Sequence, residues 1–484
     1  MSNTRLRTRL IGLLFCLSAA PLTIPAIATP DTLASNQLCL VDASASGTNS
    51  GNTWHDAYMS LQSALGASSC TEIWVAAGVY KPATAGNRTV SFNIPPGVEV
   101  FGGFAGTETT REQRDPGANL TVLSGDIDNN DGVDAHGIDP DTSAIEGSNS
   151  YHVVVMDATA GYVSVTADTV LDGFTITAGN ASNDSIATQY LGGGLYCNGG
   201  AEGVECSPTL RALVFRGNHA LYGGAICIDG YLNALAPPSG SNPTLSNVSF
   251  VGNSATFSGG AMLNATYGGT TNPVLINVTF HNNTADRGGG IYNSADSGTT
   301  IPTLTNVTFS ENQADKGAAI YNDGIFSGDS SPILTNVTFS GNSASESGGA
   351  IFNDGSQSKP ELYNIILWDD SAPQGPEIYN ANGAMPHVNH SVIAGSGGSG
   401  GSWDTLLGYD GGGNLDADPL LGPLADNGGV TATFLPSEGS PAIDAGSNCP
   451  ATDQRDVSRP QGLACDIGSV EVLPDTIFVN GFDF

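Results

Sequence analysis

The chain has 484 residues, with 64 glycines and only 14 lysines and arginines against 47 aspartates and glutamates, so its formal net charge at pH 7 is −33. Such an acidic surface repels phosphate backbones and anionic lipid head groups. Nucleic acid is therefore a poor partner, and divalent cations or neutral and basic surfaces are better ones. Abundant Asn, Thr, Ser and Gly favour many short strands and turns over helices.

Residues 1–28 have the pattern of a secretory signal peptide. Three arginines precede an apolar segment from Leu10 to Ala19, and Ala26-Ile27-Ala28 supplies small residues at the usual cleavage spacing. No later apolar run approaches the ~20 residues that a membrane helix needs, so we expect no transmembrane segment in the mature chain. These features predict an extracellular or outer-membrane-surface location.

Residues 29–70 are predicted to form an N-terminal cap. Within them, Trp54 to Leu65 has the pattern of a short amphipathic helix. Such a helix would cover the first coil, whose sheet edges are otherwise exposed. The strands expected next are Glu72 to Val79, Val98 to Phe104, Val153 to Met156 and Val170 to Ile176.

An acidic loop between these strands is a candidate Ca²⁺ site. Its alternating oxygen-bearing side chains are of the kind that Ca²⁺ prefers. An EF-hand has Gly at the sixth position and Glu at the twelfth, whereas this loop has Asp131 and Gly137 there. An improvised structural Ca²⁺ site and a plain acidic loop both remain open. The candidate ligands are Asp126, Asp128, Asn130 and Asp134.

An internal repeat of about thirty residues decides the fold. The phrase Leu-x-Asn-Val-x-Phe-x-x-Asn-x-Ala begins at Leu245, Leu275, Leu304 and Leu334, and degenerate copies begin at Leu210 and Leu362. A second phrase, Gly-Gly-Ala-Ile-Tyr-Asn or close to it, follows each time. The repeated phenylalanines are separated by steps of 35, 30, 29 and 30 residues, at Phe215, Phe250, Phe280, Phe309 and Phe339.

A unit of this size holds two or three short strands and cannot bury an apolar face alone, whereas stacked copies share one core. We therefore predict an all-β, single-stranded right-handed parallel β-helix, a solenoid over residues 71–395, with the short capping helix at its start. Leucine-rich repeats are disfavoured, because Leu-x-x-Leu-x-Leu is absent. The expected aliphatic stack is Ile226, Met262, Ile291, Ile320, Ile351 and Ile378, and the expected amide ladders are Asn264, Asn293, Asn322, Asn353, Asn380 and Asn253, Asn283, Asn312, Asn342.

Two features of the coils are candidate ligand or catalytic sites. The residues one place after the aliphatic stack point outward by strand alternation, and their aromatic members could hold sugar rings unless a loop covers them. These residues are Tyr196, Tyr292, Tyr321, Phe352 and Tyr379. Asp286-Arg287 and Asp315-Lys316 occupy one position in adjacent coils, where a lyase could place Ca²⁺-binding carboxylates and a base. A ladder of exposed ion pairs, continued by Glu346, explains the same pattern.

Seven cysteines remain after export, in a compartment that permits disulfides. No CxxC motif with matching His or Cys ligands is present, so a metal site is disfavoured. Local pairing leaves Cys227 over and predicts disulfides between Cys39 and Cys70, Cys197 and Cys206, and Cys449 and Cys465.

A Gly- and Ser-rich stretch from Gly395 to Gly413 marks a boundary before a C-terminal region at 396–470 and a tail at 471–484. The two repeated phrases resemble the polymorphic outer-membrane-protein repeat. Asp418 to Leu424, Gly439 to Gly446 and Thr452 to Arg455 resemble the choice-of-anchor Q domain. Together these resemblances imply a parallel β-helix exported by a Gram-negative-type bacterium, and they imply no specific activity.

The functional expectation is a secreted or cell-surface, non-catalytic β-helix protein that is adhesin-like or structural. Ionisable residues are sparse in the regular coils, with 7 histidines and 14 lysines and arginines in the whole chain. The alternative is a polysaccharide lyase or glycoside hydrolase, pectate-lyase-like, acting on an extracellular glycan. Extracellular polysaccharide or a host or cell-surface component is the expected partner, and Ca²⁺ is the candidate cofactor.

Overall fold

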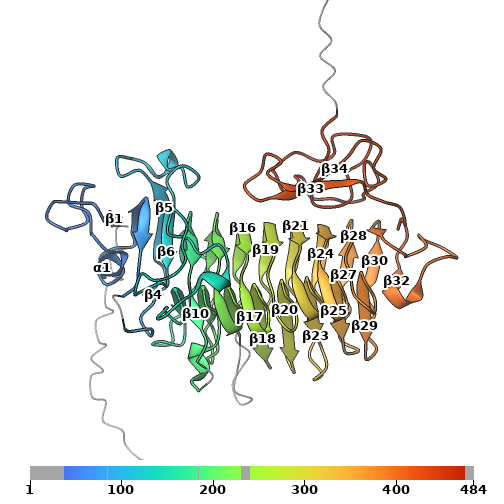
Figure 1. The fold of residues 1–484 in the computed structure, drawn as a ribbon, viewed down its shortest axis with the longest axis horizontal. Helices are drawn as coiled ribbons and strands as arrows, with labels where there is room; N and C mark the ends of the chain where they lie inside the picture. Colours follow the sequence, from blue (N-terminus) through green and yellow to red (C-terminus); the bar gives the residue numbers. More distant parts are fainter. Residues whose placement is uncertain (1–36, 84–85, 184, 231–239, 475–484) are drawn as a thin grey trace, which may run out of the picture. The chain divides into compact units, whose positions relative to one another are not determined.

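A computed structural model of the chain describes residues 37–83, 86–183, 185–230 and 240–474 (Figure 1). The predicted signal peptide at 1–28 and the part of the tail from residue 475 onward lie outside the described residues. Within them, nearly all strands pair in parallel with a strand one coil away, and the strands stack side by side along the molecule (Figure 1). The fold is a parallel β-helix, as the repeat predicts.

The first wall of the coil is a nine-stranded sheet. Its central members pair residue by residue with the equivalent position of the next repeat, for example Ile291 with Ile320 and Asn293 with Asn322. The repeat length therefore sets the register. In chain order the strands are β4 (Phe92–Asn93), β7 (Val154–Asp157), β11 (Leu195–Asn198), β15 (Ile226–Asp229), β18 (Met262–Tyr267), β20 (Ile291–Asp296), β23 (Ile320–Asp323), β26 (Ile351–Asp354) and β29 (Ile378–Ala381).

The second wall is an eighteen-stranded sheet. Its first strands are β1 (Leu38–Val41), β2 (Glu72–Ala76), β3 (Gly78–Tyr80), β5 (Glu99–Phe104), β6 (Thr121–Ser124), β8 (Val170–Asp172) and β9 (Thr175–Thr177). The regular coils contribute β12 (Thr209–Arg211), β13 (Val214–Arg216), β16 (Thr244–Val251), β19 (Val274–His281), β21 (Thr303–Ser310), β24 (Ile333–Ser340), β27 (Glu361–Tyr363) and β28 (Ile366–Trp368). The last strands are β30 (His387–Asn389), β31 (Val392–Ile393) and β32 (Tyr409–Asp410).

The four long strands of this wall bend at the asparagine of the repeated phrase. Asn306, for example, has a φ of 54°. This left-handed conformation costs most residues about 1–2 kcal/mol, and asparagine tolerates it best among residues with a side chain. The bend lets one strand serve two faces of the coil, and the same asparagine position is Asn247, Asn277, Asn306, Asn336 and, between β27 and β28, Asn364.

The third wall is short and interrupted. It consists of β10 (Asn180–Ala181), β14 (His219–Tyr222) and β17 (Ser254–Ser258), and then of the separate pair β22 (Gln313–Lys316) and β25 (Ser343–Ser347). A glycine pair then turns the chain into the nine-stranded sheet. Gly260 needs its lack of a side chain, because a Cβ there would lie 2.3 Å from the carbonyl oxygen of Gly289 in the next coil.

The predicted stacks fill the interior. The five phenylalanines are buried and stack with centroid separations between 4.7 and 5.2 Å. The aliphatic column from Ile226 to Ile378 is also buried. Both amide ladders are confirmed, since Asn264 Nδ2 donates to Asn293 Oδ1 at 2.8 Å and Asn283 Nδ2 donates to Asn312 Oδ1 at 2.9 Å. These bonds satisfy polar groups inside an apolar core, where an unpaired group is costly.

The N-terminal helix is shorter than predicted. Of the predicted helix only α1 (Leu61–Leu65) is helical, with Ser60 as its N-cap, and residues 54–60 form bends, a turn and a single bridge from Tyr58 to Val41 of β1. Distant partners hold those turns, because Trp54 Nε1 donates to Glu108 O at 2.9 Å and Thr48 N donates to Asp56 Oδ1 at 2.8 Å. The capping role of α1 stays a prediction. In the part of the chain that the structure describes, four short 3₁₀ helices lie at Arg111–Gln113, Thr142–Ala144, Ala187–Gln189 and Thr405–Leu407 (η4).

The last described segment packs on the outside of the eighteen-stranded sheet, and we call residues 418–472 the C-terminal cover. It contains the antiparallel pair β33 (Leu421–Ala425) and β34 (Thr433–Pro436). Thr308 Oγ1 donates to Gln454 Oε1 at 2.8 Å, and Thr279 Oγ1 donates to Ala432 O at 2.7 Å. The outward threonines of the repeat are therefore buried beneath the cover.

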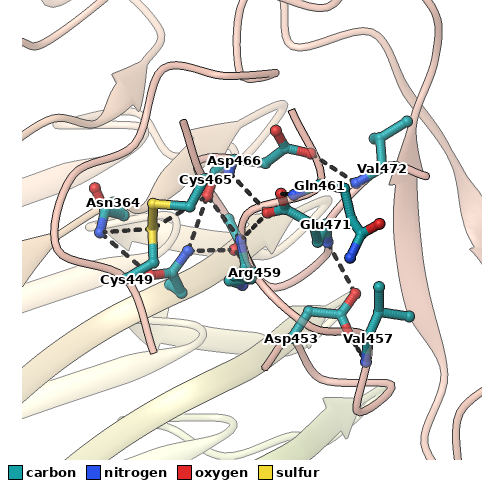
Figure 2. Close-up of polar contacts among 12 residues, drawn as sticks. Asn364, Cys449, Asp453, Val457, Arg459, Gln461, Cys465, Asp466, Glu471 and Val472 are labelled. Atoms are coloured by element: carbon teal, nitrogen blue, oxygen red, sulfur yellow. Dashed lines mark hydrogen bonds and ion pairs between the residues drawn. A yellow bond between two sulfur atoms is a disulfide. The ribbon is translucent and has the colours of Figure 1, made fainter. Parts of the chain in front are cut away.

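Buried ion pairs organise the cover from within (Figure 2). Arg459 Nη1 lies 3.0 Å from Glu471 Oε2, and both side chains are 1% exposed. Arg455 Nη2 lies 2.7 Å from Asp453 Oδ2. The disulfide between Cys449 and Cys465 joins the same cluster. Several predicted choice-of-anchor residues thus have structural contacts, while the assignment to that domain stays a prediction.

The other cysteines follow the same local pattern. Disulfides join Cys39 to Cys70 and Cys197 to Cys206, and Cys227 is buried as a free thiol. The first bond links β1 to the residues just before β2. The second closes a short loop after β11.

Candidate functional site: an aromatic groove on the coils

A cavity of about 500 Å³ opens on the outside of the regular coils, beside the turns that join the third wall to the nine-stranded sheet. We call it the aromatic groove. Its lining combines aromatic, aliphatic and charged side chains, which is the mixture typical of small-ligand sites. The lining residues are Tyr190, Leu191, Tyr222, Phe257, Ser258, Leu263, Ala265, Asp286, Arg287, Tyr292 and Ser294.

Three aromatic rings follow one another along the groove, one from each of three successive coils. The rings of Tyr190 and Tyr222 have centroids 5.8 Å apart, and those of Tyr222 and Phe257 are 5.2 Å apart. Strand pairing sets this order, because Tyr222 pairs with Ser258 across β14 and β17. Phe257 is 43% exposed, so its ring is available to a ligand.

Two of the four predicted catalytic residues line the groove. Asp286 and Arg287 follow Phe257 on the next coil, and both are exposed. Arg287 also extends over the nine-stranded sheet toward the next coil, with its Cζ 5.9 Å from the ring centroid of Tyr321. The groove therefore offers one cation and one carboxylate beside its rings.

Asp315 and Lys316 lie one coil further on and do not line the groove. Lys316 Nζ is 3.4 Å from Glu346 Oε2, and Ser345 Oγ donates to Asp315 Oδ1 at 2.6 Å. Exposed pairs of this kind contribute roughly 0–1 kcal/mol. The register of the four residues is as predicted, and the ladder of surface charges accounts for Lys316 and Glu346.

The predicted aromatic column forms, but it is packed rather than open. Tyr292, Tyr321 and Phe352 stack with centroids 5.0 and 4.7 Å apart, and all three are buried. The side chains of Arg287 and Lys316 lie over the column, and the Tyr292 hydroxyl donates to Asp323 Oδ2 at 2.6 Å. The column is the floor under the groove, and of its five predicted residues only Tyr292 lines the cavity.

The predicted Ca²⁺ ligands bond to separate partners. Asp126 Oδ2 accepts from Lys81 Nζ at 2.9 Å, Asp128 Oδ2 accepts from Ser148 N at 2.9 Å, and the exposed Asp134 accepts from its own turn. No set of three or more His, Cys, Asp or Glu side chains is placed to hold a metal ion in the described part of the chain. Asn130 is exposed, and its backbone N–H donates to Asp126.

Sequence reasoning missed the ring series Tyr190, Tyr222 and Phe257. These rings lie outside both repeated phrases, and Tyr190 stands in an irregular coil, so no thirty-residue period marks them. A weaker signal exists, because Tyr222 and Phe257 each stand within two residues of a glycine pair that turns the coil. An aromatic residue at such a turn lies on the outer rim of the solenoid.

Comparison with known proteins supports the repeat. Residues 277–294, 306–323 and 336–354 match the Chlamydia polymorphic membrane protein repeat. The protein is a parallel β-helix with polymorphic-membrane-protein-like repeats. A solved structure titled as pectate lyase Pel9A resembles it with a TM-score of 0.41 and 14% identity, over 90% of this chain and 97% of that chain. No curated protein matches the chain by sequence.

The helices of the described residues are all short. None of them has the length and apolar character that crossing a membrane would require.

Proposed function

We propose that this protein is an exported, surface-displayed β-helix that binds a glycan through the aromatic groove and does not cleave it. The groove carries the proposal, because it presents the exposed ring of Phe257 in series with Tyr222 and Tyr190. Sugar rings pack their C–H faces on aromatic rings, and contacts between two aromatic rings, which contribute about 0.5–1.5 kcal/mol each, set the scale we expect for each ring. The match to a membrane-protein repeat supports display at a cell surface.

The net charge of the chain favours a neutral glycan over an acidic one. With a net charge of −33 the surface repels polyanions at long range. Arg287 is the cation in the groove and stands beside Asp286, so the local charges nearly cancel. A neutral polysaccharide or oligosaccharide is therefore the ligand class that the site favours.

Binding of the purified chain to a panel of neutral and acidic polysaccharides tests this proposal. Phe257→Ala and Tyr222→Ala should each weaken the binding of a neutral glycan about tenfold, since each removes a ring face. Phe326→Ala is a matched control, because Phe326 is 64% exposed and does not line the groove. Unchanged affinity in both groove variants would contradict the site.

The alternative is a polysaccharide lyase acting at the same groove, favoured by the adjacent Asp286 and Arg287. A lyase needs a base near the sugar carbon that loses its proton, and Arg287 is the candidate for that role. Incubation with polygalacturonate and alginate, with and without Ca²⁺, distinguishes the two functions. Depolymerisation that Arg287→Ala abolishes would establish the enzyme and overturn the non-catalytic proposal.

A further inference from the structure

The loop between β6 and β7 concentrates negative charge. Between Asp126 and Glu146 the chain carries seven carboxylates and no lysine or arginine. Lys81, from outside the loop, neutralises Asp126 at 2.9 Å. The other carboxylates either accept backbone N–H groups or are exposed, with one exception.

That exception is Asp139, which is 0% exposed. Its backbone N–H donates to Thr177 Oγ1 at 3.1 Å, and its carboxyl group lies against that of Asp131. Neither carboxyl oxygen of Asp139 accepts a hydrogen bond. Burial, and then the charge of Asp131, raise the pKa of Asp139, and the Lys81 ammonium, which pairs with Asp126, offsets this only in part.

Asn149 adds a third buried acceptor at the same place. Its Nδ2 donates to Asp131 Oδ2 at 2.6 Å and to Ala178 O at 2.9 Å, which fixes the orientation of the amide. Its Oδ1 is buried and accepts nothing. Asp131 is therefore flanked by two side chains that together leave three buried oxygens without a donor.

Asp370 and Glu377 form a second buried acid pair, in which one shared proton is enough to satisfy the oxygens that lack a partner. Asp370 Oδ1 accepts from Asn342 Nδ2 at 2.8 Å, and one oxygen of Glu377 accepts from the Asp370 N–H. Each of these two residues has a single buried oxygen without a partner, and one proton between them satisfies both. At Asp131 and Asp139 one proton would leave further acceptors unsatisfied, whereas a cation can bind several oxygens at once.

We propose that Asp131, Asp139 and Asn149 hold a Ca²⁺ ion. Two carboxylates and an amide oxygen are ligands of the kind that Ca²⁺ prefers, and it binds 6–8 oxygens in irregular geometry. A cavity of about 450 Å³, whose lining includes Lys81, Asp126 and Asp131, borders the site at Asp131 and can supply waters. Because only two carboxylates meet, we expect modest affinity, in the range of about 10⁻⁴–10⁻³ M that extracellular Ca²⁺ modules have.

The proposed ligand set differs from the one that the loop sequence suggests. Asp126, Asp128 and Asp134 have other partners. The site instead joins three parts of the loop, of which Asp139 is bonded to Thr177 of β9 and Asn149 to Ala178 directly after it. The ion would therefore hold the parts of a long surface loop together where that loop contacts the end of β9.

Thermal unfolding of the full chain with about 10 mM CaCl₂ or with chelator tests the proposal. We expect Ca²⁺ to raise the Tm of the wild type by at least about 2 °C, and Asp139→Asn to lose this increase. Asp134→Asn is the matched control, because it makes the same carboxyl-to-amide change at an exposed position in the same loop. Its Tm should respond to Ca²⁺ as the wild type does.

Equilibrium dialysis with radioactive Ca²⁺ at about 100 mM NaCl, which screens diffuse binding, supplies a second readout that does not depend on folding. Wild type and Asp134→Asn should each bind one more ion than Asp139→Asn. Equal binding by all three proteins, or a Tm that does not depend on Ca²⁺, would overturn the site. An Asp139→Asn variant that is more stable than the wild type in both solutions would show that the two carboxyl groups share a proton only.

Discussion

At the scale of single residues, the buried carboxyl groups are the unusual feature of this solenoid. Asp370 occupies the position that Asn253, Asn283, Asn312 and Asn342 fill in earlier coils, and it ends that ladder by accepting from the last amide. Glu377 replaces the small residue of the Gly-Gly-Ala-Ile phrase, so its side chain meets Asp370 inside the coil. Burial raises the pKa of both carboxyl groups, and the charge of Asp370 raises that of Glu377 further.

Protonation of this pair predicts a pH-dependent stability. Both carboxyl groups have a pKa near 4 in the unfolded chain. The contribution of the protonated pair to the free energy of unfolding is therefore complete below about pH 4, and it is lost as the pH rises through the raised pKa values of the folded state. Glu377→Gln replaces the carboxyl group beside Asp370 by an amide, which has a hydrogen-bond donor and an acceptor but does not titrate. Relative to wild type, the variant should therefore gain at least about 1 kcal/mol between pH 5 and 9 in urea unfolding.

The matched control is Glu438→Gln, which changes the same group at an exposed position. Its difference from wild type should not vary with pH in this range. Parallel pH profiles for wild type and Glu377→Gln would show that the pair does not share a proton in the native state.

At the scale of elements, the bend inside the long strands decides where the strand can turn. Asn306 Nδ2 donates to Asn277 Oδ1 at 3.2 Å, and Asn277 Nδ2 donates to Asn247 Oδ1 at 3.2 Å, so the bends of successive coils are tied together. This ladder of amides ends at Asn247. In the coil before it, the same position is Ala212, which has a φ of 47° but no side-chain amide to continue the ladder. There the strand breaks into β12 and β13.

Ala212→Asn should extend this ladder and stabilise the protein by about 1 kcal/mol, because asparagine tolerates the left-handed conformation and its Oδ1 can accept from Asn247. Equilibrium urea unfolding measures the gain. The reciprocal change, Asn306→Ala, should cost about 2 kcal/mol or more through strain and two lost hydrogen bonds. A destabilised Ala212→Asn would show that this bend has no room for the amide.

At the scale of the whole molecule, stability is divided between stacked coils and the C-terminal cover. In a solenoid each coil contacts mainly its neighbours, so a destabilising substitution in one part need not unfold the other coils. The cover depends instead on buried charges such as Arg459 and Glu471. Removing one partner of a buried ion pair typically costs about 3–5 kcal/mol.

Arg459→Met should therefore loosen the cover and leave the coils folded. Hydrogen exchange should accelerate in residues 418–472, and the β-sheet circular dichroism should stay unchanged. Arg216→Met serves as a control, because the half-buried Arg216 belongs to β13 of the coils and its Nε donates to the carbonyl oxygen of Pro140 at 3.0 Å, outside the cover. Loss of the β-sheet signal in Arg459→Met would show that the cover and the coils unfold as one unit.

The sequence alone determined the architecture, because a period of about thirty residues places each residue type above its own kind. That period assigns Phe280, Ile291 and Asn293 to interior stacks, and the hydrogen bonds and ring distances confirm them. Local cysteine spacing likewise indicated the pairs that form disulfides.

Tertiary structure alone decided which side chains outside the repeated stacks meet, because those contacts are not periodic. Phe257 joins Tyr222 and Tyr190 across successive coils, and Asp139 and Asn149 each meet Asp131 through the folding of a long loop. The covering of the aromatic column is also a tertiary feature, since the side chains of Arg287 and Lys316, rather than a long loop, lie over the buried rings of Tyr321 and Phe352. A repeat specifies what stacks along the axis, while the surface between repeats depends on loops that follow no period.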